Sequence, residues 1–119
     1  MRGHDITTQP AGARIRIEVD GEIVAESDDV IALSETGLPT RYYFPPQDVR
    51  PEFLRESNAH TVCPFKGTAS YHDLHTPSGE HAAFVWHYPE PIEGVEAIRG
   101  RLAFYNDRVS VFVDGEPEG

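Results

Sequence analysis

The chain has 119 residues, 39% of them hydrophobic, so it is long enough for one domain that needs no disulfide to stabilise its core. Its formal net charge of -10 argues against nucleic acid and anionic membranes as partners, because the summed field repels phosphate groups. A single cysteine excludes an intramolecular disulfide, and neither a signal peptide nor a bilayer-spanning apolar run is visible, so we expect a cytoplasmic protein.

The beginning of the chain changes character at residue 13. Residues 1–12 show no apolar periodicity and are predicted to form a flexible N-terminal arm. After them, Ile15, Ile17 and Val19 alternate with charged residues, which predicts a strand with one buried face. Ten prolines and ten glycines favour many turns and short strands over long helices, and so an all-β fold.

Short strands and turns are predicted to follow. Asp20-Gly21 suits a two-residue type I′ turn, because both residues tolerate positive φ, and residues 22–27 would return as the partner strand. A third strand is predicted at residues 30–33 and an aromatic strand at residues 41–44, which two prolines end. Residues 46–50 are predicted to form a single helical turn.

The stretch from residue 60 to residue 71 contains the only cysteine and is predicted to be a turn that leads into a central strand. Pro64 lacks an amide donor and favours an extended conformation at Cys63. Gly67 permits a backbone conformation or a close approach that other residues do not. We therefore expect the remaining strands to pack around this stretch.

The second half continues the pattern. A hairpin loop is predicted at residues 76–79, an alternating strand at 81–88, a short helical turn at 92–98, and two more strands at 102–105 and 109–113.

Together these elements predict a single β domain over residues 13–114, followed by a frayed acidic tail at 115–119. Roughly eight to ten short strands with turns between them indicate a small antiparallel barrel or a two-sheet fold with one or two helical turns.

Several unusual phrases occur in a fixed order along the chain. They are Glu35-Thr36-Gly37-Leu38-Pro39, Arg41-Tyr42-Tyr43-Phe44-Pro45, Asp48-Val49, Cys63-Pro64-Phe65-Lys66-Gly67-Thr68-Ala69-Ser70-Tyr71, Trp86-His87-Tyr88-Pro89 and Leu102-Ala103-Phe104-Tyr105. In these phrases the chain resembles domain-of-unknown-function family 427, an uncharacterised bacterial family sometimes labelled nucleotidyltransferase-like. The resemblance implies a mainly antiparallel structure similar to the β-tent folds, in which two sheets meet at an angle.

The resemblance suggests two chemistries that the residues do not support. Other β-tent families often hold zinc with two pairs of cysteines, whereas this chain has only Cys63. Nucleotidyl transfer needs carboxylates that hold Mg²⁺ and a loop that binds phosphate. The sequence has neither an Asp-x-Asp pair on a strand nor a Gly-Lys-Ser/Thr loop. We therefore predict no cofactor and no metal.

Thiol catalysis and metal binding are the other chemical interpretations. Cys63 is a candidate nucleophile with His60 as its base and Lys66 favouring the thiolate, and the alternative is a small buried residue before a turn. The six histidines suggest a metal, but His72 and His75 face opposite ways on a regular strand. We predict solvated surface histidines instead.

The preferred functional interpretation is a pocket for a small polar or anionic ligand. Arg41 can bind a carboxylate or phosphate with two N–H donors, and Lys66 adds a point charge. In the structural alternative, Arg41 pairs with Glu35 or Asp48 to fix a loop, and the aromatic residues belong to the core. The predicted lining residues are Glu35, Thr36, Arg41, Tyr43, Asp48, Lys66, Tyr71, Trp86 and Tyr88.

Whether the protein is an enzyme stays open at this level. The competing class is a non-catalytic interaction or structural module whose exposed strand edge pairs with a second copy to form a homodimer. The two classes differ in geometry. A ligand site requires Arg41 and Lys66 to line one concavity, whereas a module requires a flat shared surface.

Overall fold

The first hairpin follows directly from alternation and turn chemistry. In the computed structural model, which describes residues 5–118, β2 (Ile15–Val19) pairs antiparallel with β3 (Glu22–Ser27). Asp20 and Gly21 have φ angles of 55° and 79°, the positive values that a type I′ turn needs. The three apolar residues of β2 are buried, as the sequence predicted.

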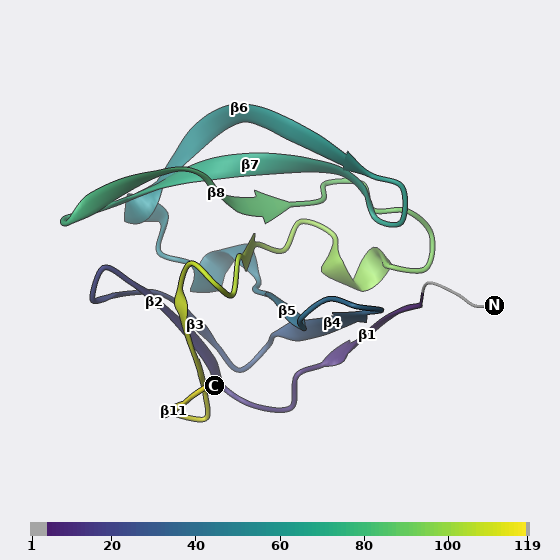
Figure 1. Cartoon of the computed structure of the whole chain (residues 1–119), viewed down its shortest axis with the longest axis horizontal. Helices are drawn as coiled ribbons and strands as arrows, with labels where there is room; N and C mark the ends of the chain where they lie inside the picture. The colour runs from purple at the N-terminus through teal and green to yellow at the C-terminus, as the bar shows by residue number, and fades with distance from the viewer. Residues whose placement is uncertain (1–4, 119) are drawn as a thin grey trace.

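Two sheets form the lower part of the molecule in the view of Figure 1. In the first, β1 (Ile6–Pro10), β4 (Ile31–Glu35) and β5 (Arg41–Tyr43) are arranged in the order β1-β4-β5. In the second, β10 (Ser110–Val113) and β11 (Glu116–Pro117) extend the first hairpin in the order β11-β10-β2-β3.

The third sheet lies above the other two and contains the longest strands (Figure 1). Its members are β6 (Leu54–Cys63), β7 (Gly67–Thr76), β8 (Gly79–His87) and β9 (Ala103–Phe104), paired in chain order. The predicted central strand is thus confirmed, because β7 has a neighbour on each side. The turn before it is shorter than predicted, because residues 60–63 belong to β6.

In the described part of the chain the helical segments are three short 3-10 turns, η1 (Pro46–Asp48), η2 (Pro51–Phe53) and η3 (Glu96–Ile98). Two of them fall where the sequence predicted helical turns. Over residues 5–118, no helix has the length and apolar character that crossing a membrane would require.

The all-β prediction is confirmed, but the strands within residues 5–118 form three antiparallel sheets and no closed barrel. Phe44 and Leu102 exchange backbone hydrogen bonds of 2.8 and 2.9 Å as an isolated bridge between two sheets. Pro45 follows at once and has no amide to continue such a ladder, so β5 stops before it can close the barrel.

Both ends of the described chain differ from the prediction of a flexible arm at 1–12 and a frayed tail at 115–119. Strand β1 pairs with β4 over five residues, and β11 pairs with β10. The partner of β1 is distant in the sequence, so the side-chain pattern of β1 does not reveal the pairing. Strands β10 and β11 are instead joined by Asp114-Gly115, whose φ angles of 50° and 85° repeat the turn chemistry of Asp20-Gly21. Residues 1–4 and 119 of the predicted arm and tail lie outside the described residues.

The core consists of two clusters with different compositions. The larger we call the aliphatic cluster, because most of its side chains are aliphatic and none carries a polar group. It comprises Ile15, Ile17, Val19, Val24, Ala25, Val30, Phe44, Val49, Leu74, Phe84, Val85, Leu102, Phe104 and Val111. The smaller, the aromatic cluster, comprises Leu33, Tyr43, Ala69, Trp86, Tyr88, Val95, Ile98 and Ala103. The aromatic cluster contains hydroxyl and indole groups that need hydrogen-bond partners, and the candidate site lies beside it.

Candidate functional site

The β6–β7 turn brings a lysine into the interior. Within the turn, the Lys66 amide donates to the Cys63 carbonyl at 3.1 Å, and the Ile92 amide donates to the Lys66 carbonyl at 2.9 Å. Gly67 has a φ of 120°, and a Cβ at this position would lie 3.1 Å from the Glu90 carbonyl oxygen. Glycine therefore allows the chain around residue 91 to pack against the turn, as the sequence suggested.

An almost buried ion pair joins this turn to the first sheet. Lys66 Nζ lies 2.5 Å from Glu35 Oε1, and the two side chains are only 11% and 6% exposed. Glu35 is the last residue of β4, so the pair connects the β1-β4-β5 sheet to the β6–β9 sheet. Removing either partner would leave a charge in a poorly solvated place.

Aromatic side chains form the wall beside this ion pair. Trp86 on β8 donates its indole N–H to the Tyr43 hydroxyl at 3.2 Å, and the two rings meet edge to face. Tyr105 also packs against Trp86, with ring centroids 4.6 Å apart. Burial raises the pKa of Tyr43 to about 12, and burial also raises the pKa of Tyr88. Both phenols are therefore neutral at physiological pH.

Arg41, the first residue of β5, places its guanidinium at the edge of these rings. The guanidinium carbon lies 5.6 Å from the Trp86 ring centroid and 5.9 Å from that of Tyr105, within cation–π distance. Nη1 donates to Asn106 Oδ1 at 2.8 Å, and the Asn106 amide nitrogen donates to the Thr40 carbonyl at 2.9 Å. A neutral amide thus fixes the orientation of the cation.

These side chains line one pocket of about 170 Å³, the liquid volume of about six water molecules. Two cations and one carboxylate are among its lining residues, so the lining carries a net charge of +1 in a chain of -10. The residues that line it are Glu35, Leu38, Arg41, Tyr43, Lys66, Tyr71, Trp86, Tyr88 and Tyr105. The sequence proposed all of them except Leu38 and Tyr105.

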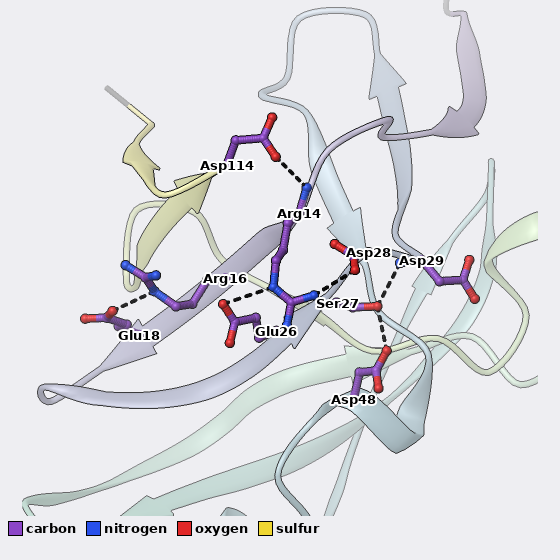
Figure 2. A network of polar contacts seen from close by, with 9 residues as sticks. All are labelled: Arg14, Arg16, Glu18, Glu26, Ser27, Asp28, Asp29, Asp48 and Asp114. Carbon is purple, nitrogen blue, oxygen red and sulfur yellow. Dashed lines mark hydrogen bonds and ion pairs between the residues drawn. The ribbon is translucent and has the colours of Figure 1, made fainter.

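Two residues proposed for the pocket lie elsewhere. Thr36 Oγ1 accepts a hydrogen bond from the backbone N–H of Asp5 at 2.9 Å, and Asp48 Oδ2 accepts one from the Ser27 hydroxyl at 2.6 Å. Figure 2 shows that this aspartate belongs to a network of acidic and basic side chains around β2 and β3. For Asp48 the reason is that η1 begins at a proline and places its third residue opposite the end of β3.

Two lining residues were missed by the prediction, and only one of them could have been recognised from the sequence. Tyr105 follows directly after β9 and belongs to one of the phrases that carry the family resemblance, so it could have been included. Leu38 lies in the loop between β4 and β5, where no periodicity indicates the direction of a side chain. Only the folded path of that loop brings it to the pocket.

The proposed catalytic pair is not brought together. Cys63 is half-buried and packs against the aromatic cluster. His60 lies three positions earlier on a regular part of β6, so it faces the opposite side, where its Nδ1 lies 3.3 Å from Ser70 Oγ. His60 is therefore not placed to act as a base for the Cys63 thiol.

The histidines are distributed over several contacts. His81 Nε2 lies 2.8 Å from Asp20 Oδ2, while the rings of His72 and His87 lie 5.3 Å apart. Burial, with a smaller contribution from His72, lowers the pKa of His87. Among residues 5–118, no three His, Cys, Asp or Glu side chains are grouped so that they could hold a metal ion.

A larger groove of about 770 Å³ is lined by Arg41 and Asn106, among other residues. Its lining includes the carboxylates of Asp107 and Glu118, so with Arg41 its net charge is -1. The groove therefore offers an anion less than the smaller pocket does, although it is more spacious. We assign the candidate site to the smaller pocket because its lining is positive and includes the almost buried Lys66–Glu35 ion pair.

Comparison with known proteins identifies the family. Residues 7–115 match the family model described as "Domain of unknown function (DUF427)", so the chain belongs to this family. The matched segment includes every residue that lines the pocket. A search of curated proteins found no match.

Proposed function

We propose that this member of the DUF427 family binds a small anionic molecule in the pocket lined by Arg41 and Lys66. The observation that supports this function is the charge of the lining, which is +1 although the whole chain carries -10. A positive pocket in a negative protein concentrates the opposite charge locally, whereas the surrounding surface repels anions.

The shape of the pocket restricts the anion. Arg41 presents a planar guanidinium with several N–H donors, and a carboxylate or phosphate can accept two of them side by side. The rings of Trp86 and Tyr105 flank the cation and offer flat surfaces to a planar group. A volume of about 170 Å³ is below the roughly 300 Å³ at which sites for drug-sized ligands begin, so we favour a small acid over a nucleotide.

The buried ion pair has a supporting role in this function. Lys66 and Glu35 bond to each other, and their charges cancel within the lining. Arg41 is then the charge that an incoming anion balances, and Lys66 contributes its remaining N–H donors. We expect substitution of Arg41 to weaken binding without unfolding the protein, since this side chain is only half-buried.

Thermal shift with a panel of anions tests the proposal. The panel contains acetate, benzoate, phosphate and sulfate, measured with the wild type, Arg41→Gln and Arg108→Gln. Arg108 is a matched control, because it also stacks on Tyr105, at 4.5 Å, but does not line the pocket. A ligand at about a hundred times its Kd stabilises the folded state by about 2.7 kcal/mol.

We expect at least one anion to raise the Tm of the wild type and of Arg108→Gln, and to leave the Tm of Arg41→Gln unchanged. Equal shifts in all three proteins would mean that the anion binds elsewhere. If no anion shifts the wild type, the proposed function is wrong.

A further inference from the structure

Three exposed apolar residues either line the pocket or are linked directly to its lining residue Lys66. Within residues 5–118, the large apolar residues with high exposure are Leu38 at 52%, Val62 at 78%, Phe65 at 46% and Ile92 at 42%. Leu38 lines the pocket itself. Phe65 immediately precedes Lys66 in the β6–β7 turn, and the amide of Ile92 bonds to the carbonyl of Lys66. We call Leu38, Phe65 and Ile92 the apolar collar.

The fourth exposed residue is placed differently. Val62 is paired with Thr68 on the β6–β7 hairpin. Its neighbour Cys63 packs against the aromatic cluster, so strand alternation directs Val62 to the opposite face of the sheet, away from that cluster. It has the same apolar character and greater exposure than the collar residues. Val62 is therefore a matched control for any effect of the collar.

We propose that the ligand is an amphiphile, with an anionic head in the pocket and a short apolar chain lying on the collar. This inference rests on the proposed function, because the head occupies the anion pocket. A space of about 170 Å³ holds little more than the head group, so the rest of a longer molecule leaves past Leu38, the one exposed residue of the lining. At this exit it meets apolar surface that would otherwise face water, and covering that surface is favourable.

The size of the collar distinguishes an alkyl chain from a protein partner. Stable protein interfaces bury roughly 1,200 Å² or more in total. Three side chains that are each already about half covered supply only a small part of such an area. They suit a chain of a few methylene groups. A bilayer surface is disfavoured too, because a chain of net charge -10 is repelled by anionic lipids.

A homologous series of alkyl carboxylates tests the inference. Trp86 is the only tryptophan of the chain and lines the pocket, so its fluorescence reports occupation of the anion site. Acetate, butanoate, hexanoate and octanoate are titrated into the wild type, Arg41→Gln, the double variant Phe65→Ser/Ile92→Ser, and Val62→Ser. Acetate serves as the probe of the head site alone.

For the wild type and Val62→Ser we expect Kd to fall about twofold for each added methylene, half the effect of complete burial, because the collar covers one side of the chain. In Phe65→Ser/Ile92→Ser we expect this dependence to flatten while the Kd of acetate stays the same. The unchanged acetate affinity also shows that the double variant is folded.

The contrary outcomes separate the two proposals. If Kd depends on Arg41 but is the same from acetate to octanoate, the amphiphile inference is overturned and the anion pocket stands. An unchanged chain-length dependence in Phe65→Ser/Ile92→Ser also overturns it. If no carboxylate alters Trp86 fluorescence, the amphiphile inference is overturned, and the anion pocket is also wrong if phosphate and sulfate leave the Tm of the wild type unchanged.

Discussion

The two core clusters differ in what their side chains require. The aliphatic cluster fills the space between β2, β3 and the β6–β9 sheet with side chains that need only contact. The aromatic cluster contains Tyr43, Trp86 and Tyr88, whose polar ends require partners, and it adjoins the Lys66–Glu35 ion pair. In this chain, polar chemistry is buried where turns and strand ends of different sheets meet, and a pocket forms at the same place.

This difference has a testable consequence. Changes in the aliphatic cluster should lower stability and leave anion binding intact, because no part of it lines the pocket. Changes in the aromatic cluster and its ion pair should affect both properties. The predictions below compare the two halves, beginning with the largest expected effect.

Replacing Lys66 with methionine should cause the largest loss. The substitution leaves Glu35 charged in a nearly buried position, and breaking a buried pair in this way costs about 3–5 kcal/mol. Urea denaturation measures the loss. The double variant Lys66→Met/Glu35→Leu removes both charges and should recover most of it. A single variant as stable as the wild type would show that the pair does not matter.

Tyr43→Phe removes the acceptor of the Trp86 indole N–H in a buried place. We expect a loss of about 1–3 kcal/mol, the cost of an unsatisfied buried donor. Trp86 fluorescence should change at the same time, because the hydroxyl lies against the indole. An unchanged spectrum together with unchanged stability would argue against this hydrogen bond.

Ile17→Val in the aliphatic cluster should be milder. It removes one methylene from a side chain that is 2% exposed, and such changes cost about 0.5–1.5 kcal/mol. The Kd of any anion found for the wild type should stay the same, because Ile17 does not line the pocket. A changed Kd would mean that the two halves of the core are coupled.

Acid should weaken the fold slightly through His87. The folded-state pKa of this histidine lies below the ordinary value of 6.5, so the unfolded chain binds the proton more readily. Its contribution to stability is complete above pH 6.5 and is lost as the pH falls through the folded-state pKa. Urea denaturation between pH 7 and pH 5 should show a smaller decline for His87→Gln than for the wild type.

Much of the fold could be predicted because local chemistry determines it. The positive φ angles at Asp20 and Gly21 follow from their residue types, and Thr76 pairs with Gly79 across the predicted hairpin loop. On β8 the prediction was less accurate. Alternation along the predicted strand at residues 81–88 places Ala82 on the same face as Phe84. Ala82 is nevertheless exposed, because a bulge with a φ of 48° at Ala83 shifts the register. A sequence pattern of period two does not reveal such an insertion.

The candidate site could be predicted in part for a similar reason. Arg41 and Lys66 lie 25 positions apart in the sequence, yet their residue types and aromatic neighbours indicated a shared pocket, and the fold places both in its lining. The ion pair between Lys66 and Glu35 was not predicted, because it depends on how two sheets are oriented to each other. The hydrogen bond from Ser27 to Asp48 depends on the same kind of long-range packing.

A crystal of the protein grown with para-bromobenzoate would test the central claim most directly, since anomalous scattering locates the bromine. The account predicts a carboxylate within hydrogen-bonding distance of the Arg41 guanidinium, with the bromine toward the exit past Leu38. Bromine found in the groove beside Val109 and Phe112, or elsewhere away from Arg41, would contradict the assignment of the anion site to this pocket.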